Sequence, residues 1–288
     1  MATLLDHRYV KMNGLGNEIL VLDLRDEPVE ASAAQIRALA RPSAVPFDQA
    51  MVLYPARRPD TLAFVRIFNA DGSQAAACGN GTRCICAYEA RRTGLSHMVF
   101  ESEAGLLVCD HLADGGVRVD MGAPRLSARE IPLAEEAVNT LGHVLPGHAD
   151  LGPAAFVSMG NPHAIFFPAH DADPTVFDLD RLGPVLEHHG LFPERANISF
   201  ARVLSPDHLR LDVWERGAGR TRACGTAACA AAVAAARTGR TGRAVRVSLP
   251  GGDLNIEWRE RDDHVLMTGP VAFEAEGRIT PAMVSEAA

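Results

Sequence analysis

The chain has 288 residues, with 28 Lys or Arg against 36 Asp or Glu, so its formal net charge is −8. A hydrophobic content of 47% and a charged content of 22% are typical of a globular protein with a core and exclude a disordered chain. The acidic balance argues against nucleic acid as a partner, and no apolar run reaches the roughly 18 residues of a membrane span.

The first half of the chain is predicted to consist of strands around one helix. A weak helical pattern around Ala31–Ala40 precedes Leu62–Phe68, which is typical of a strand. A polar turn, Asn69–Ser73, leads to Cys78-Gly79 and then to a helix over roughly Asn80–Arg92. Three further strand-like runs follow: Met98–Phe100, Leu106–His111 and Val117–Met121.

The second half shows a similar order of elements. We expect Glu130–Pro153 to be a connecting strand-and-loop region, and a weaker helix around Leu179–His188. Leu209–Trp214 is a predicted strand that leads through a polar turn to Cys224. The following helix, Thr226–Arg237, is nearly all Ala and Val, which predicts a tightly packed central helix. Three strand-like runs follow again: Val245–Leu249, Leu254–Trp258 and Val265–Met267.

Short motifs recur along the chain in the same order and at a nearly constant distance. The repeated motifs are Gly16-Asn17 at Gly160-Asn161 (144 residues), Ala77-Cys78-Gly79 at Ala223-Cys224-Gly225 (146), Arg92-Thr93-Gly94 at Arg237-Thr238-Gly239 (145), and Met121-Gly122 at Thr268-Gly269 (147). We therefore predict two homologous halves of about 144 residues, each one domain, with a site between them.

The composition provides few residues that could bind a cofactor or a metal ion. Lys11 is the single lysine, which leaves one candidate for a Schiff base with pyridoxal phosphate. The cysteines form no C-x-x-C pair, and no histidine cluster completes a zinc site. The N-terminus lacks the order of a signal peptide, so we expect a cytoplasmic protein with no membrane partner and reduced thiols. The six cysteines are Cys78, Cys84, Cys86, Cys109, Cys224 and Cys229.

Cys78 and Cys224 each stand immediately before a predicted helix. The free N–H groups and the positive end of a helix dipole favour an anion there, so a thiol at this place is expected to have a lowered pKa. Gly79 and Gly225 let the backbone approach a bound carboxylate closely. If the two helix starts face each other, one thiol can remove a proton from a carbon and the other can return it to the opposite face.

These residues lie within longer motifs that resemble the diaminopimelate epimerase family over nearly the whole chain. The motifs are Lys11-Met12-Asn13-Gly14-Leu15-Gly16-Asn17, Phe68-Asn69-Ala70-Asp71-Gly72-Ser73, Cys78-Gly79-Asn80-Gly81-Thr82-Arg83-Cys84, Gly160-Asn161-Pro162-His163, Trp214-Glu215-Arg216-Gly217-Ala218-Gly219 and Ala223-Cys224-Gly225-Thr226.

The resemblance implies a cofactor-independent isomerase that interconverts LL- and meso-diaminopimelate, in bacterial lysine and peptidoglycan precursor biosynthesis. It also implies a cytoplasmic homodimer with no metal. The implied fold is α/β, with two pseudo-symmetric domains that each wrap a β-barrel-like sheet around a central helix. The domains would be residues 1–123 joined by the C-terminal segment 270–288, and residues 124–269.

Carried over position by position, the family's two catalytic bases are Cys78 and Cys224, with His163 and Glu215 close to the thiols. The resemblance also assigns groups that bind the substrate. Those for its α-carboxylate are Gly79, Asn80, Gly225 and Thr226; those for its distal end are Asn69, Asn161, Asn197, Glu215 and Arg216; Asn17 and Gln49 match further substrate contacts.

The chain departs from the family's usual pattern at several positions, which leaves the substrate preference slightly open. The differences are Asn13 in place of His, Glu18 in place of Asp, Pro46 in place of Gly and Arg220 in place of Glu. Arg222 adds a second cation two residues before Cys224, and both arginines would favour its thiolate if they pointed inward.

Three alternatives remain open from the residues alone. A proline or hydroxyproline racemase of the same two-cysteine design would not need the polar set that binds a second charged group. A related isomerase with a carboxylate base would lack the paired cysteines. A non-catalytic amino-acid-binding module would keep a cleft but would need no pair of thiols.

Overall fold

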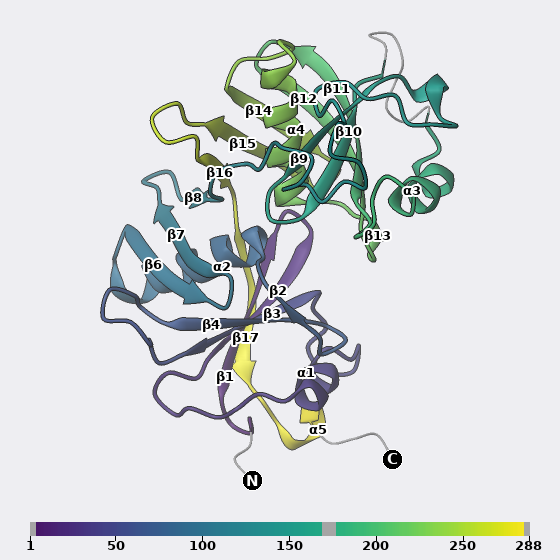
Figure 1. Ribbon diagram of the computed structural model, residues 1–288. Helices are drawn as coiled ribbons and strands as arrows, with labels where there is room; N and C mark the ends of the chain where they lie inside the picture. Colours follow the sequence, from purple (N-terminus) through teal and green to yellow (C-terminus); the bar gives the residue numbers. More distant parts are fainter. Residues whose placement is uncertain (1–3, 169–176, 285–288) are drawn as a thin grey trace. The chain divides into compact units, whose positions relative to one another are not determined.

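The computed structural model describes residues 4–168 and 177–284. The chain divides into two compact units, residues 1–119 together with 269–288, and residues 120–268. In each unit, strands pack around one main helix, as can be followed in Figure 1. No helix in the described part of the chain is long and apolar enough to span a bilayer.

The first unit is built from β1 (Arg8–Gly14), β2 (Asn17–Asp23), α1 (Ala33–Leu39), β3 (Gln49–Tyr54), β4 (Phe64–Asn69), β5 (Gln74–Ala75), α2 (Gly79–Thr93), β6 (His97–Ser102), β7 (Gly105–His111), β8 (Val117–Asp120), β17 (Ala272–Arg278) and α5 (Pro281–Val284). The C-terminal strand β17 pairs antiparallel with β1, so it completes the sheet that the N-terminal strands begin.

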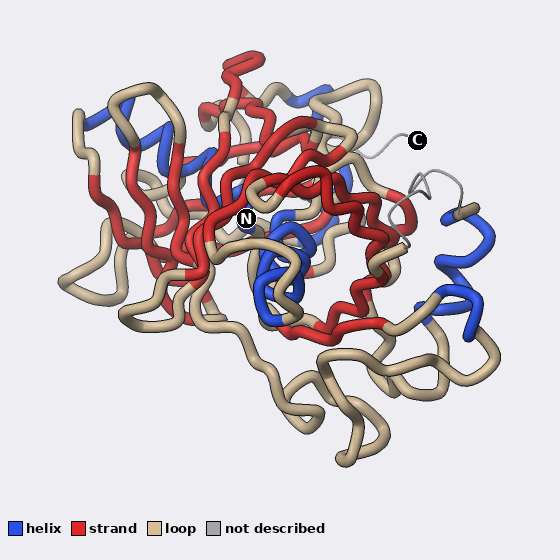
Figure 2. Tube along the Cα trace, turned by 90° about the horizontal axis from the view of Figure 1, so that it is seen from above, coloured by secondary structure: helices blue, strands red, loops and turns tan. Residues whose placement is uncertain are grey.

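The second unit contains η1 (Ala149–Leu151), β9 (Ala154–Ser158), β10 (Pro162–Phe166), α3 (Leu179–Glu187), β11 (Asn197–Ser205), β12 (His208–Glu215), β13 (Gly219–Arg220), α4 (Gly225–Arg237), β14 (Ala244–Leu249), β15 (Gly252–Trp258) and β16 (Val265–Gly269). Its central helix α4 packs against β9, β10, β11, β12, β14 and β15, and Figure 2 shows strands around such a helix.

The two units repeat the same topology, which confirms the predicted duplication. The pairs β1–β2 and β9–β10 are antiparallel, while β2–β3 and β10–β11 are parallel. The same agreement continues through β3–β4 and β11–β12, which are antiparallel, and through β4–β6 and β12–β14, which are parallel. In both units the main helix follows the short strand that pairs with the preceding long one.

Cysteines begin both main helices, as the sequence predicts. Cys78 is the N-cap of α2 and Cys224 the N-cap of α4, both in extended backbone conformation. The structure places each helix start one residue earlier than predicted, at Gly79 and Gly225. Gly94 ends α2 with a φ of 77°, a left-handed conformation that glycine adopts without strain.

Several strands were not predicted, namely β1, β2, β3, β5, β9, β10, β11, β13 and β17. Most of them are buried on both faces, so they lack the alternation of polar and apolar residues that marks a half-exposed strand. The region Glu130–Pro153 contains η1 and an isolated bridge between His143 and Ala154, and the expected strand is absent from these described residues.

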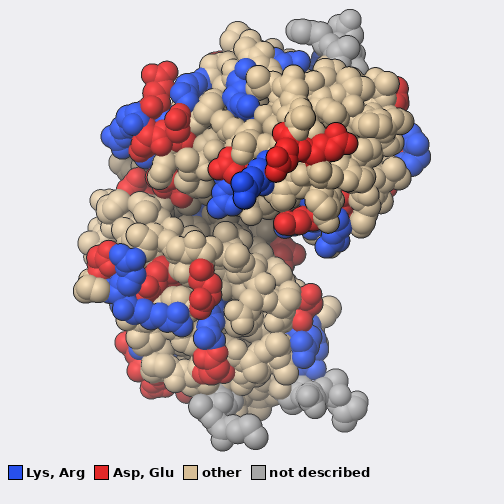
Figure 3. Space-filling view, in the orientation of Figure 1, with Lys and Arg blue, Asp and Glu red and all other residues tan. Residues whose placement is uncertain are grey.

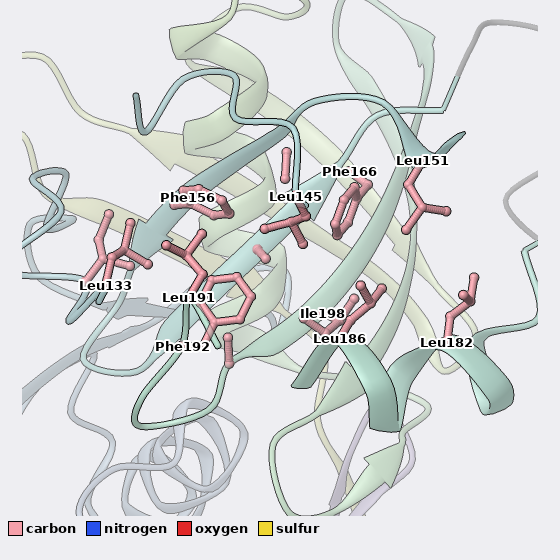
Figure 4. Close-up of a cluster of buried hydrophobic side chains, with 14 of the residues drawn as sticks. Leu133, Leu145, Leu151, Phe156, Phe166, Leu182, Leu186, Leu191, Phe192 and Ile198 are labelled. Carbon is pink, nitrogen blue, oxygen red and sulfur yellow. The ribbon is translucent and has the colours of Figure 1, made fainter. Parts of the chain in front are cut away.

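The second unit has a core of aromatic and aliphatic side chains between its sheet and α3 (Figure 4). Leu182 and Leu186 of α3 belong to it and lie on the side of Ile198 in β11, while Phe156 and Phe192 pack edge to face. This packing fixes the position of α3 on the sheet. On the surface, acidic and basic side chains are interspersed on the visible face of each unit (Figure 3).

Candidate active site

The sulfur of Cys78 caps the first turn of α2. Its Sγ accepts a hydrogen bond from the backbone N–H of Gly81 at 3.1 Å, and its carbonyl accepts the N–H and the hydroxyl of Thr82. An α-helix supplies no acceptor for its first-turn donors, so the N–H groups of Gly79 and Asn80 remain outside the helical ladder. The Cys78 sulfur therefore lies among donors that favour negative charge.

The hairpin that joins β1 and β2 packs against this helix start. Leu15 and Gly16 form its turn with φ values of 63° and 88°, and Asn17 follows directly as the first residue of β2. A Cβ on Gly14 would lie 3.2 Å from the Cβ of Asn80, so the hairpin and α2 are in close contact there. The buried side-chain oxygens of Asn17 and Asn80 have no hydrogen-bond partner among the described residues.

Gln49 and Asn69 face each other across β3 and β4. Gln49 Nε2 donates to Asn69 Oδ1 at 2.9 Å, and Asn69 Nδ2 donates to Ser73 Oγ at 3.0 Å. Gln49 leaves the same face of β3 as Met51, whose sulfur abuts Gly81 of α2. The predicted site residues of the first unit thus lie at or near the start of α2, on the β1–β2 hairpin, or on β3 and β4, where β3 packs against this helix.

In the second unit, Cys224 is buried, and Thr226 Oγ1 lies 3.4 Å from its Sγ. The negatively charged carboxylate of Glu215 acts electrostatically on the same thiol. Burial, and then the negative charge of Glu215, raise the pKa of the Cys224 thiol well above its ordinary value. The lowered pKa that a helix start by itself predicts is therefore wrong for Cys224, and this residue is a thiol at neutral pH.

A chain of polar side chains leads from Cys224 to His163. Asn161 Nδ2 donates to Thr226 Oγ1 at 3.3 Å, so the Thr226 hydroxyl is left to donate toward Sγ. Asn161 Oδ1 lies 3.0 Å from His163 Nε2, which must then carry a hydrogen. Burial, together with the positive charge of Arg216, lowers the pKa of His163 to about 3, so its imidazole is neutral.

The remaining lone pair of His163 is unusual. Its Nδ1 is buried, and it has no hydrogen-bond partner within the described residues. Buried polar atoms in proteins are nearly always paired. His163 is paired with Asn197 across β10 and β11. Its free Nδ1 is suited to accept a hydrogen bond from a donor on a bound molecule.

Asn197 and Arg216 are joined through the backbone. Asn197 Oδ1 accepts the Arg216 N–H at 2.8 Å, and Asn197 Nδ2 donates to the Pro162 carbonyl at 3.2 Å. Arg216 Nη1 donates to the Glu194 carbonyl at 2.8 Å, while the side chain stays partly exposed. Asn197 thus fixes the main chain on which Arg216 stands.

Arg220 and Arg222 do not act on the Cys224 sulfur in the way that inward-pointing cations would. Arg220 Nη2 donates to Asp212 Oδ1 at 3.2 Å, and its Nη1 lies 3.5 Å from Asp180. Arg222 is exposed. The pKa of the Cys224 thiol is accordingly governed by its burial and by Glu215.

One residue of this site was missed from the sequence. Thr221 Oγ1 donates to Glu215 Oε1 at 2.6 Å and so orients the carboxylate that faces Cys224. Its position between the Glu-Arg-Gly turn and the cysteine was the available signal. In the residues that the structure describes, His, Cys, Asp and Glu form no group of three that could hold a metal ion.

Comparison with known proteins identifies the family. A family model described as diaminopimelate epimerase matches residues 9–127 and 155–274. The chain is 53% identical to the diaminopimelate epimerase of Rhodopseudomonas palustris strain BisB18, and 53% identical to that of Nitrobacter hamburgensis. In both cases the similarity covers 100% of either chain. The chain belongs to the diaminopimelate epimerase family.

Solved structures confirm the predicted fold. A probable proline racemase from Agrobacterium radiobacter K84 is similar over 98% of this chain and 96% of its own, with a TM-score of 0.63 at 16% identity. A protein of the phenazine biosynthesis PhzF family from Enterococcus faecalis covers 95% of this chain and 99% of its own, with a TM-score of 0.65 at 13% identity. At such identities the likeness is one of fold alone.

Proposed function

We propose that this chain interconverts LL- and meso-diaminopimelate by a two-base proton transfer, with Cys78 and Cys224 as the two acid–base groups. The observation that carries the proposal is the duplicated helix start: a buried cysteine is the N-cap of the main helix in both units. Membership of the family supplies the substrate, and the local chemistry of each thiol supplies the roles.

The two thiols differ in their surroundings, which supports different resting states. Cys78 accepts a hydrogen bond from Gly81 N–H at the positive end of a 15-residue helix, an environment for a thiolate. For Cys224, burial and then the negative charge of Glu215 raise the pKa of the thiol. Cys78 is therefore the proposed base and Cys224 the proposed acid when the substrate first binds.

In the proposed step, the Cys78 thiolate takes the α-proton and becomes a thiol, and the electron pair of the broken C–H bond stays on the α-carbon. The Cys224 thiol then delivers its proton to the opposite face of the same carbon and becomes a thiolate. The proposal requires the two sulfurs to reach opposite faces of one carbon. In the reverse direction the roles exchange.

The groups around the thiols suit an amino acid with two charged ends. The first-turn N–H groups at Gly79, Asn80, Gly225 and Thr226 are proposed to hold the α-carboxylate. Arg216 offers a planar fork to the distal carboxylate. The unpaired oxygens of Asn17 and Asn80 and the unpaired Nδ1 of His163 are acceptors for the ammonium groups or for N–H donors nearby.

The test is deuterium incorporation at the α-carbon in heavy water, with reduced protein and LL-diaminopimelate, and with L-proline as the control substrate. We expect exchange and epimerisation of diaminopimelate and none of proline. Absence of exchange with diaminopimelate refutes the proposed function. Exchange of proline alone would instead favour the racemase of proline or hydroxyproline.

Single cysteine variants separate a catalyst from a binding module. Cys78→Ala and Cys224→Ala are each expected to abolish epimerisation while binding of diaminopimelate, measured by calorimetry, persists. Cys229→Ala, which removes a buried thiol from the interior of α4, is the matched control and should retain turnover. Undiminished epimerisation in either of the first two variants contradicts the two-thiol mechanism.

We also propose that the chain has two domains, forms a homodimer and resides in the cytoplasm. The division into two compact units supports the proposed domains, and the six cysteines, all within the described residues, are free thiols, as suits a reducing compartment. Light scattering after size-exclusion chromatography tests the dimer, because a mass of one chain, 30.8 kDa, would contradict it.

A further inference from the structure

Glu187 is the last residue of α3, and its side-chain carboxylate is buried inside the second unit. Its side chain is 4% exposed. A buried carboxylate is costly unless donors satisfy it. The structure gives Glu187 three such donors from two other parts of the chain.

Two of these donors belong to the segment that carries Glu215 and Arg216. Trp214 Nε1 donates to Glu187 Oε2 at 2.8 Å, and the Gly217 N–H donates to Oε1 at 2.9 Å. The two oxygens thus bracket Glu215 and Arg216, one from each side along the chain. The third donor is Arg195, whose Nη1 lies 3.3 Å from Oε1.

The helix that holds Glu187 is itself tightly positioned. A Cβ on Gly183 would lie 2.3 Å from the Trp214 ring, so the backbone of α3 rests directly on the indole. Leu182 and Leu186 also belong to the hydrophobic core, where Leu186 lies beside Ile198 (Figure 4). Glu187 is therefore held by the packing of its helix in the core as well as by its contact with Trp214.

The turn joins β12 to the short strand β13, whose pairing sets Trp214 opposite Arg220 and Glu215 opposite Gly219. Gly217 and Gly219 have φ values of 75° and 86°. Because glycine has no Cβ, its backbone can adopt many other conformations once the hydrogen bonds of the turn are removed. The Arg216 N–H is held by Asn197 Oδ1, and the Ala218 N–H donates to the Glu215 carbonyl. Glu187 supplies the fixed point beyond Arg216.

We infer that Glu187 is a positioning residue for substrate recognition: it fixes the 214–217 segment so that Arg216 is presented to the distal carboxylate. The inference rests on the proposed function, because that function gives Arg216 its ligand. Glu215 is anchored separately by Thr221, so loss of Glu187 should weaken substrate binding more than it slows proton transfer.

Glu187→Gln is the sharpest variant, because it keeps the shape of the side chain. Glutamine has one acceptor oxygen and one donor amide group, whereas Trp214 Nε1 and Gly217 N are both donors. One of these donors must then face an N–H group. We expect the KM for LL-diaminopimelate to rise about tenfold and kcat to change less than about threefold.

The fluorescence of Trp214 reports directly on its hydrogen bond to Glu187. The chain has two tryptophans, so the Trp258→Phe background leaves Trp214 as the only emitter. Glu187→Gln in this background should shift the Trp214 emission, and hydrogen exchange at the Gly217 amide should become faster. A merely structural role would lower the melting temperature and leave KM unchanged.

Glu136→Gln is the matched control, since it makes the same chemical change at an exposed glutamate of the same unit. It should leave KM and Trp214 emission as in the parent protein. If the parent turns over diaminopimelate and Glu187→Gln has an unchanged KM, the inference is wrong and the proposed function stands. If the parent shows no turnover, the proposed function fails first.

Discussion

The Cys224 thiol is buried and feels the negative charge of Glu215, and burial and this charge together reverse the effect expected of a helix N-terminus. A helix start stabilises a thiolate, but a carboxylate beside a buried sulfur opposes it. Cys224 is therefore a thiol at neutral pH. Cys78, which is also buried, instead accepts the Gly81 N–H at its sulfur.

Glu215→Gln should lower the pKa of the Cys224 thiol, because the variant removes the negative charge next to a buried sulfur. The pH dependence of Cys224 alkylation by iodoacetamide, followed by peptide mass spectrometry in reduced protein, measures this pKa. We expect the inflection to move to lower pH. Glu136→Gln should leave it in place, and an unchanged inflection in Glu215→Gln would contradict the effect assigned to Glu215.

Thr221→Val should reduce kcat, since valine keeps the shape of threonine but removes the hydroxyl that orients Glu215. Hydrogen bonds to charged groups are worth about 1.5–3 kcal/mol, so a loss of about tenfold or more is expected. Thr221→Ser keeps the donor and should restore most of the rate. Equal rates for the valine and serine variants would show that the hydroxyl has no such role.

Gly183→Ala should destabilise the second unit by about 1–3 kcal/mol, because the new methyl group overlaps the Trp214 ring. Urea unfolding followed by circular dichroism measures the free energy of unfolding. Gly190→Ala is the matched control: a Cβ there meets no atom within 4 Å, so its effect should be small. Similar losses in both variants would argue against the close packing of α3 on Trp214.

Arg25→Met should destabilise the first unit by about 3 kcal/mol, since Arg25 bridges Asp23 of β2 and the buried Glu89 of α2 at 2.6 and 2.8 Å. Arg92 also contacts Glu89 but is half exposed. The effect should appear in urea unfolding at pH 7. A free energy of unfolding equal to that of the parent protein would show that the bridge contributes nothing.

The ion pairs of Arg25 with Asp23 and Glu89 also predict how the free energy of unfolding depends on pH. Burial by itself would raise the pKa of Asp23 and of Glu89, but their arginine partners outweigh it and lower both values. The stabilisation is therefore fully present above the unfolded pKa values, about 3.9 and 4.3, and is lost as pH falls below them. Unfolding of the parent between pH 7 and 3 should show this loss, and Arg25→Met should show a shallower one.

Local features of this chain could be predicted from sequence with good accuracy. The starts of α2 and α4 were each placed within one residue, because a cysteine and a glycine before an apolar helix are signals carried by neighbouring positions. The duplication was visible as four motifs at nearly equal spacing. Strands such as β2 and β9, apolar on both faces, gave no such local signal.

The sequence by itself determined the family, the two halves and the two cysteines at helix starts. Only the tertiary structure decided that burial and Glu215 raise the pKa of the Cys224 thiol, that Asn197 holds the main chain of Arg216, and that Glu187 accepts the Gly217 N–H. These effects depend on burial and on contacts between residues far apart in the chain; Glu187 and Gly217 are 30 positions apart. A pattern of neighbouring residues cannot specify such contacts, because packing brings them together.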